Sequence, residues 1–164
     1  MAHNELTMDS NVVDVAFSKS GTRIAVLMDN HFSVFLWSLK ARPVVAPILE
    51  SSYPLPDGPN SRPRQIVFLG ENEVYILKNT GPDNAEIERT TLETRLTKTV
   101  HQSANSEQLF SIFPALSHEA LWFSHVTQPG KPISYSSITP QSNGEFAITS
   151  SDQSPKADTY WAEA

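Results

Sequence analysis

A strand-turn-strand pattern recurs three times along the chain, and it constrains the fold more than any other feature. Residues 12–17 and 23–28 are short β-branched runs separated by the turn signal Ser20-Gly21. The same pattern returns over residues 64–77 and again over residues 109–124. Alternation of this kind predicts antiparallel strands joined by tight turns.

The spacing of these units indicates their architecture. Their leading strands begin near Val12, Arg64 and Leu109, so the units are 52 and 45 residues apart. A four-stranded propeller blade occupies roughly 40 to 45 residues, and a proline-rich loop accounts for the excess in the first unit. The pattern therefore predicts an all-β fold, a partial WD-repeat-like β-propeller of about three four-stranded antiparallel blades.

The length of 164 residues fits one domain. We expect an N-terminal segment over 1–10, a partial propeller over 11–150, and a polar tail or truncated continuation over 151–164. The blades are expected at about 11–52, 64–101 and 108–150. Because propellers close in rings of roughly 4 to 8 blades, the chain is either an unusual three-unit sheet protein or a piece of a longer propeller chain.

Three segments have a pattern of their own. Residues 32–37 carry large apolar side chains at both alternate positions, which predicts a strand between neighbours. Six prolines between positions 43 and 63 predict a long surface loop with at most one edge strand near 44–49. Residues 86–92 and 96–100 alternate weakly, which predicts outer, half-exposed strands.

The period-two pattern also predicts which side chains form the cores between sheets, with the alternate positions less buried. The predicted core residues are Val15, Phe17, Ile24, Val26, Ile66, Phe68, Val74, Ile76 and Phe110.

Composition excludes several classes of protein. The chain has no cysteine, which removes disulfides, thiolate zinc sites, iron–sulfur ligation and a cysteine nucleophile. Its 12 Lys and Arg against 18 Asp and Glu give a net charge of −6, which disfavours nucleic-acid binding. The N-terminus lacks the basic-then-apolar order of a secretory signal, and no apolar run reaches the length of a membrane span. We expect a soluble intracellular protein.

The histidines do not form a metal motif. His118-Glu119 resembles the start of the zinc motif His-Glu-x-x-His, but Trp122 stands where the second histidine is needed. His118 and His125 are seven residues apart, which on a strand places them on opposite faces. We interpret the histidines as surface or turn residues and predict no metal site.

No other constellation predicts catalysis. The nucleophile signature Gly-x-Ser-x-Gly is missing, and no glycine-rich phosphate loop is present. The pairs Glu71/Glu73 and Glu86/Glu88 could face together on strands, as glycosidases require, but solvated outer faces explain them better. We predict no catalytic, cofactor-binding or metal-binding residue, and partner-binding residues are unknown.

The remaining candidates concern binding. The basic patch Arg62-Pro63-Arg64 could touch phosphate or an acidic partner, although Arg64 is better explained as the polar start of a strand. Tryptophan is enriched at interaction hot spots, and Trp161 lies in the tail. Trp37 and Trp122 lie inside strand patterns and are predicted to be core residues.

Several segments together resemble a known family. Residues 11–27 (NVVDVAFSKSGTRIAVL) and 32–37 (FSVFLW) are similar to the opening of a blade in the second N-terminal β-propeller of Elongator complex protein 1. The segments 64–77 (RQIVFLGENEVYIL), 87–92 (IERTTL) and 121–123 (LWF) follow in the order and spacing of fungal members. The resemblance covers roughly residues 8–138.

The resemblance implies a non-catalytic scaffold segment whose partners are other Elongator subunits and whose complex modifies the wobble uridine of tRNA. In that family catalysis and its cofactors reside in a different subunit, so no catalytic residue is carried onto this chain. We predict no cofactor, no membrane association and no small-molecule substrate, and the net charge disfavours direct nucleic-acid binding by this segment, although a direct tRNA contact stays open. The implied location is the cytoplasm, with the nucleus as a second location.

Two alternatives stay open. The chain could be an unrelated β-propeller interaction module of another intracellular scaffold. It could also be a small β-rich hydrolase, which would require Ser, His and Asp to converge within hydrogen-bond reach.

Overall fold

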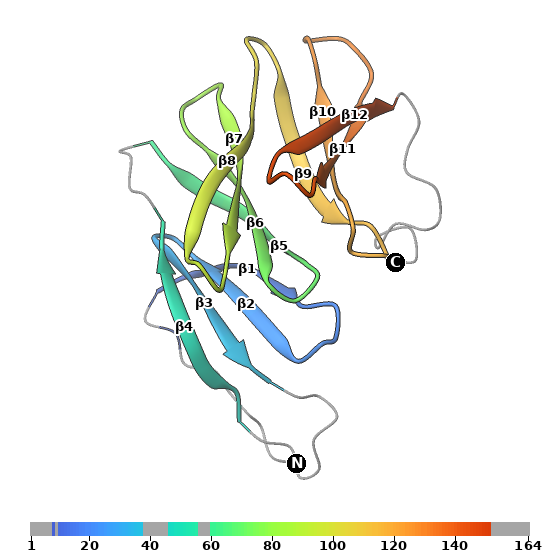
Figure 1. The fold of residues 1–164 in the computed structure, drawn as a ribbon. Coiled ribbons are helices and arrows are strands. Elements are labelled where there is room, and N and C mark those ends of the chain that lie inside the picture. The colour runs from blue at the N-terminus through green and yellow to red at the C-terminus, as the bar shows by residue number, and fades with distance from the viewer. Residues whose placement is uncertain (1–7, 9, 38–45, 56–59, 152–164) are drawn as a thin grey trace.

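The computed structural model describes residues 8, 10–37, 46–55 and 60–151, and these form three four-stranded antiparallel sheets (Figure 1). Within each sheet every strand pairs with the next strand along the chain. Sheet A contains β1 (Val12–Phe17), β2 (Arg23–Met28), β3 (His31–Leu36) and β4 (Ile48–Pro54). Sheet B contains β5 (Arg62–Leu69), β6 (Glu73–Asn79), β7 (Ala85–Thr91) and β8 (Leu96–Gln102). Sheet C contains β9 (Gln108–Pro114), β10 (Leu121–Val126), β11 (Ser134–Pro140) and β12 (Phe146–Ser151).

This arrangement confirms the predicted fold class of three four-stranded antiparallel sheets. The turn after the first strand of each sheet contains a residue in the left-handed region. These residues are Gly21 (φ 71°), Gly70 (φ 67°) and His118 (φ 57°). Glycine adopts this conformation without a steric penalty, which explains why two of the three turns contain it.

Sheet B lies between the other two sheets and is buried on both faces (Figure 1). Ile66 and Phe68 face sheet A, together with Val74 and Ile76. The alternate residues of the same strands face sheet C, and Tyr75 is among them. The prediction that alternate positions are less buried is therefore wrong for sheet B, because a second sheet covers its other face. The prediction that β3 lies between neighbouring strands is confirmed, because β2 and β4 pair with it on either side.

Three of the nine predicted core residues are exposed instead. Val15 is 44% exposed and Phe17 is 45% exposed, because they lie on the face of sheet A that no other described sheet covers. Phe110 is 41% exposed because it is the extra residue of a bulge, where the pairing of β9 with β10 passes from Ser111 to Leu109. The other six predicted core residues are buried.

Two strand predictions also need correction. The edge strand expected near 44–49 runs from Ile48 to Pro54, while positions 44 and 45 lie outside the described residues. The sequence predicts a half-exposed β7, but most of its side chains are buried, because β7 lies between β6 and β8 and packs against sheet C. β8 is the exposed outer strand.

The predicted tail 152–164, including Trp161, lies outside the described residues. In the portion of the chain that the structure describes, no helix is long and apolar enough to span a membrane.

Candidate functional site

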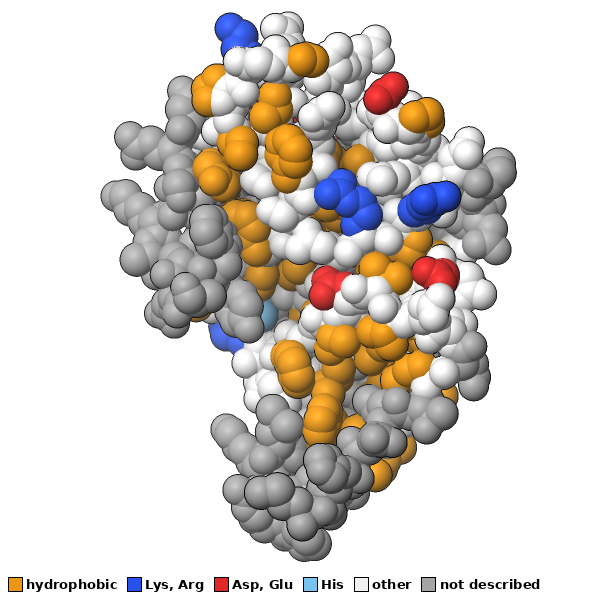
Figure 2. Space-filling model, turned by 180° about the vertical axis from the view of Figure 1, so that it is seen from behind, with side chains coloured by type: hydrophobic (Ala, Val, Ile, Leu, Met, Phe, Trp, Pro, Cys, Tyr) orange, Lys and Arg blue, Asp and Glu red, His pale blue; other side chains and the backbone are white. Residues whose placement is uncertain are grey.

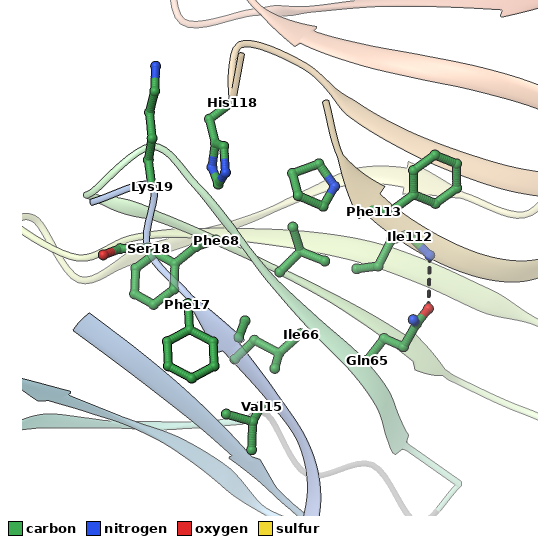
Figure 3. Close-up of a pocket in the computed structure, with 13 residues that line it drawn as sticks. Val15, Phe17, Ser18, Lys19, Gln65, Ile66, Phe68, Ile112, Phe113 and His118 are labelled. Carbon is green, nitrogen blue, oxygen red and sulfur yellow. Dashed lines mark hydrogen bonds between the residues drawn. The ribbon is translucent and has the colours of Figure 1, made fainter. Parts of the chain in front are cut away.

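A pocket of about 410 Å³ lies where β1, β5 and β9, the first strands of the three sheets, come together (Figure 3). Its wall is mainly apolar, with Val15, Phe17 and Phe113 among the lining residues, while Lys19 and His118 lie at one end. Ligand pockets typically measure roughly 300 to 1,000 Å³, so this volume suits a side chain or short segment of a partner. Of the polar lining residues, Ser18 accepts the backbone N–H of Arg23 and His118 accepts that of Gly70.

The turns that follow β1 and β5 are bound to one another beside this pocket. The Ser20 backbone N–H donates to Glu71 Oε1 (2.6 Å), and the Ser20 hydroxyl donates to Glu71 Oε2 (3.0 Å). Arg23 donates to the backbone carbonyl of Glu71 (2.8 Å) and to Asn72 Oδ1 (3.0 Å). Burial acts to raise the pKa of Glu71, but hydrogen bonds from Ser20 and Ser18 and the charge of Arg23 outweigh it and lower that pKa.

His118 joins the turn after β9 to the turn after β5. Its Nδ1 accepts the backbone N–H of Gly70 at 3.2 Å, and Lys19 Nζ donates to the carbonyl of Ser117 at 2.9 Å. Burial lowers the pKa of His118, and the charge of Lys19 adds to this effect. Because Nδ1 is an acceptor here, the neutral imidazole is the form that holds the turns together.

The first strands are joined by a hydrogen bond that repeats from sheet to sheet. Asp14 Oδ2 accepts the backbone N–H of Ile66 at 3.0 Å, and Gln65 Oε1 accepts the backbone N–H of Ile112 at 2.8 Å. Each acceptor lies in the first strand of one sheet and reaches the first strand of the next. We call this repeated contact the inter-sheet hydrogen bond.

Arg64 strengthens the joint between sheets B and C. Its guanidinium donates to the carbonyls of Leu109 (2.8 Å) and Phe110 (2.9 Å). These donors are therefore used within the protein, as expected from the interpretation of Arg64 as part of a strand. The neighbouring Arg62 is exposed.

A serine, a histidine and a carboxylate do come together in the third unit. Ser136 Oγ lies 2.9 Å from His125 Nε2, and His125 Nδ1 lies 2.7 Å from Glu107 Oε1. The approach of Nδ1 is an ion-pair contact without an aligned hydrogen bond among the described residues. Sequence reasoning missed this group because its members come from a turn and two different strands.

Burial argues against a catalytic use of this group. Ser136 is 1% exposed, so its hydroxyl is closed to a substrate, and Ser150 Oγ lies 3.1 Å from it. His125 is also buried, its ring 5.0 Å from that of Phe123, which corrects its interpretation as a surface or turn histidine. His101 lies 3.4 Å from the same Glu107 oxygen. Within the described ranges, no group of three or more side chains could hold a metal ion.

The pair Glu86/Glu88 does not lie on a solvated face, which corrects that prediction. Lys78, which is buried, lies 2.9 Å from Glu86 Oε1 and 2.7 Å from Glu88 Oε1. Burial acts to lower the pKa of Lys78, but the two carboxylates outweigh it and raise that pKa. Burial raises the pKa of Glu88 despite Lys78. The group is an internal ion-pair network, not a pair of catalytic acids facing a substrate.

Glu71 and Glu73 serve different contacts. Glu71 binds the turn of sheet A, whereas Glu73 lies 3.3 Å from Arg89 and accepts the hydroxyl of Tyr75 at 3.1 Å. The two carboxylates therefore do not face a common site.

The two described tryptophans lie on the outer faces of the end sheets instead of in a central core. Trp37 is half-buried and packs against the outer face of sheet A with Met8. Trp122 is half-buried in β10, on the opposite side of the strand from Leu121 and Phe123, which face sheet B. This corrects the prediction that both are core residues.

Comparison with known proteins gives one family. The family described as the ELP1 N-terminal second β-propeller matches residues 1–158. No curated protein sequence is significantly similar to the chain.

Solved structures share the fold. Sqt1 of Saccharomyces cerevisiae matches with a TM-score of 0.54 and 9% identity over 93% of this chain and 39% of that one. Hsv2 of Kluyveromyces lactis has a TM-score of 0.52 and 13% identity, covering 86% of this chain and 36% of Hsv2. The WD40 domain of SCAP from fission yeast has a TM-score of 0.51 and 11% identity, covering 87% and 34%. The chain thus spans well under half the length of these structures.

Proposed function

Because the chain belongs to the family of the ELP1 N-terminal second β-propeller, we propose that it is a non-catalytic scaffold segment of the Elongator complex. In this role it supports modification of the tRNA wobble uridine through contacts with other Elongator subunits. The observation that carries the proposal is the family match over residues 1–158. The matched solved structures support the fold alone.

The geometry agrees with a role in binding. The turns beside the pocket are tied together by Glu71, Arg23 and His118, which gives a rigid surface next to an apolar cavity. Rigid turns around a cavity are suited to recognise a partner segment. The buried Ser136 favours a structural role for the serine–histidine–carboxylate group over the hydrolase alternative.

The proposal also includes the domain bounds and the cellular location. We propose that residues 11–150 act as one partial propeller, with segment 1–10 before it and 151–164 after it, and that the protein works in the cytoplasm and also in the nucleus. The net charge of −6 supports protein contacts over direct binding of tRNA. The similarity to fungal members stays a prediction, because the family match carries no information about the source.

The test is a deletion of residues 8–138 from the full scaffold subunit in cells. We expect fewer partner subunits recovered on the scaffold and less modified wobble uridine in tRNA. The matched control is Ser136→Ala in the same subunit, which removes a buried hydroxyl that lies 2.9 Å from His125 Nε2. The control should leave partner recovery and modification unchanged.

Two results would overturn the proposal. Unchanged modification and partner recovery after the deletion would exclude a scaffold role. Loss of modification on a fully assembled complex would indicate a direct tRNA or regulatory contact instead. A loss of hydrolytic activity in Ser136→Ala would support the hydrolase alternative.

A further inference from the structure

The hairpin between β11 and β12 carries the dipeptide Asn143-Gly144, and asparagine is followed by glycine at no other place in the sequence. In such a pair the backbone nitrogen of the glycine can attack the side-chain amide carbon of the asparagine. Glycine has no Cβ to crowd that nitrogen. Neighbouring groups of one chain also react at effective concentrations far above those of separate molecules. The hairpin therefore brings a nucleophile and an electrophile together.

Both residues of this pair are open to solvent. Asn143 and Gly144 are exposed, and a Cβ at Gly144 would meet no other atom within 4 Å. The φ of Gly144 is 80°, in the left-handed region that glycine adopts without strain. The turn thus requires glycine at this position for its conformation, and the reactive pair is part of how the hairpin is built.

The side-chain amide of Asn143 is held by the residue that follows the glycine. Its Oδ1 accepts the backbone N–H of Glu145 at 3.0 Å, and its Nδ2 donates to Glu145 Oε2 at 3.1 Å. Attack on Cγ develops negative charge on Oδ1. A backbone N–H that is already directed at this atom stabilises such a charge. The Glu145 N–H is thus placed as the donor that favours the attack.

One hydrogen bond of the turn opposes the reaction. The Gly144 N–H donates to the carbonyl of Gln141 at 3.0 Å. The nitrogen must lose this partner before it attacks, so local opening of the turn precedes the chemical step. Both residues are exposed, so this opening uncovers no buried side chain of the pair.

A second exposed asparagine provides a comparison within the same chain. Asn105 lies in a turn and is followed by Ser106, which also has a left-handed conformation (φ 72°). The side chain of Ser106 crowds its backbone nitrogen. Within the described ranges, no backbone N–H is bonded to the amide oxygen of Asn105. Asn105 therefore lacks both features that favour attack at Asn143.

We propose that Asn143 is a site of spontaneous deamidation, with the Glu145 backbone N–H as the donor that stabilises charge on Oδ1. The Gly144 nitrogen gives its proton to hydroxide and bonds to Asn143 Cγ. The bond between Cγ and Nδ2 then breaks, and the amide nitrogen takes a proton from water and leaves as ammonia. Water opens the resulting cyclic imide at either carbonyl, which gives aspartate or isoaspartate. The proposal does not depend on the Elongator assignment.

The modification alters the joint between sheets B and C. Phe146, the first residue of β12, has its ring centre 5.0 Å from the guanidinium carbon of Arg89 and 5.6 Å from Lys98 Nζ, both in sheet B. Figure 1 shows this end of β12 beside β8. Isoaspartate lengthens the backbone ahead of Phe146 by a methylene, and either product sets a second carboxylate beside that of Glu145. We expect both changes to loosen the contact of Phe146 with the two cations.

The test is to age the purified 164-residue chain, folded by circular dichroism, at mildly alkaline pH and to map its peptides by mass spectrometry. Conversion at Asn143 should be at least about tenfold faster than at Asn105, a difference of about 1.4 kcal/mol in activation free energy. A protein-isoaspartate methyltransferase identifies the isoaspartyl product. Equal conversion at the two asparagines, or none at Asn143, would overturn the proposal.

The modified chain can be separated from the original by charge. It carries one more negative charge than the original chain, whose net charge is −6. Figure 2 shows the charged side chains of the described residues scattered over one face, so ion-exchange chromatography responds to such a single added charge. Hydrogen exchange of the β12 amides should be faster in the separated modified fraction. Unchanged exchange there would refute the effect on the joint.

Two variants separate the effect of the structure from that of the dipeptide. Asn143→Gln keeps an amide but needs a larger ring for attack, and it should stay unmodified. Ser106→Gly gives Asn105 a glycine neighbour without a backbone donor on its amide oxygen. Asn143 should still react faster than Asn105 in that variant. Equal rates at the two sites would refute the role of the Glu145 N–H, and conversion of Asn143→Gln at the original rate would refute the cyclic imide.

Discussion

Sheets A and B begin with first strands of the same pattern, yet the corresponding side chains have opposite environments. Phe68 in β5 is 1% exposed, whereas Phe17, at the matching place in β1, is 45% exposed. Sheet A covers Phe68, and no described sheet covers Phe17. The comparison shows that the strand pattern defines which face is apolar, while the neighbouring sheet decides whether that face is buried.

The largest expected difference is between Phe68→Ala and Phe17→Ala. Phe68→Ala should lower the free energy of unfolding by about 3 to 5 kcal/mol, because it leaves a cavity between sheets A and B. Phe17→Ala should lower it by less than about 1 kcal/mol, because the ring is already half in solvent. Urea unfolding measures the free energy of unfolding of both variants. Equal losses would contradict the comparison.

The second prediction concerns the buried charge of sheet B. Lys78→Ala should lower the free energy of unfolding by about 3 kcal/mol, because Glu86 and Glu88 would lose their buried cation. Lys131→Ala, at an exposed turn position, is the control and should change the same quantity by less than about 0.5 kcal/mol. Thermal and urea unfolding provide the measurement. A Lys78→Ala protein as stable as the control would show that the network is solvated.

The third prediction sharpens the comparison at the joints. Asp14→Ala and Gln65→Ala each leave a backbone N–H of the next sheet without its acceptor, which should cost about 1 to 2 kcal/mol of unfolding free energy. Asp14→Asn keeps an acceptor oxygen and should recover most of that loss. Hydrogen exchange should be faster at Ile66 in Asp14→Ala and at Ile112 in Gln65→Ala. Unchanged exchange at these amides would refute the role of the inter-sheet hydrogen bond.

The smallest effect is a pH dependence at the joint between sheets B and C. The pKa of His118 is lowered by burial and by Lys19, so the unfolded chain, with the ordinary value near 6.5, binds the proton more readily. The contribution of neutral His118 to the free energy of unfolding is therefore fully present above about pH 7. It is lost as pH decreases from about 6.5 through the lowered pKa. Since His118 is only half-buried, solvent screens the effect and we expect a loss below about 1 kcal/mol.

His118→Asn is the control for this pH effect, because asparagine tolerates the positive φ but does not titrate. The difference in unfolding free energy between pH 7.5 and pH 5.5 should be smaller in the variant than in the original chain. Both pH values lie above the range in which Glu71 takes up a proton, because the pKa of Glu71 is lowered. Glu71 therefore does not contribute to the difference. An identical pH profile for both proteins would exclude His118 as the titrating group.

Local pattern predicted the strands well, because alternation and turn residues such as Gly21 and Gly70 act within a few positions of the sequence. It failed where burial depends on partners far along the chain. Val15 and Phe17 are a β-branched and an aromatic residue, as are Ile66 and Phe68, so their exposure could not be distinguished without the order of the sheets. The bulge at Phe110 depends on the pairing of β9 with β10, which composition does not specify.

The contacts that build the candidate site were less accessible to sequence reasoning. The pocket draws its wall from strands roughly 50 positions apart, and the group of Glu107, His125 and Ser136 is joined by packing alone. One signal was present: Asp14 and Gln65 occupy the same place in successive units, each able to accept a hydrogen bond. A comparison of the units with one another, position by position, could have identified the joints.

The strictly sequential order of strands in each sheet has a consequence for synthesis on the ribosome. Within each sheet, every strand after the first pairs with the one made just before it, so sheet A can complete its pairing before any residue of sheet B has emerged. Each later sheet then meets a finished surface, and its first strand is the part that reaches the preceding sheet's acceptor at Asp14 or Gln65. Folding can therefore follow translation from the N-terminus, one sheet at a time, and a pause between sheets would leave a folded unit whose face toward the next sheet is uncovered.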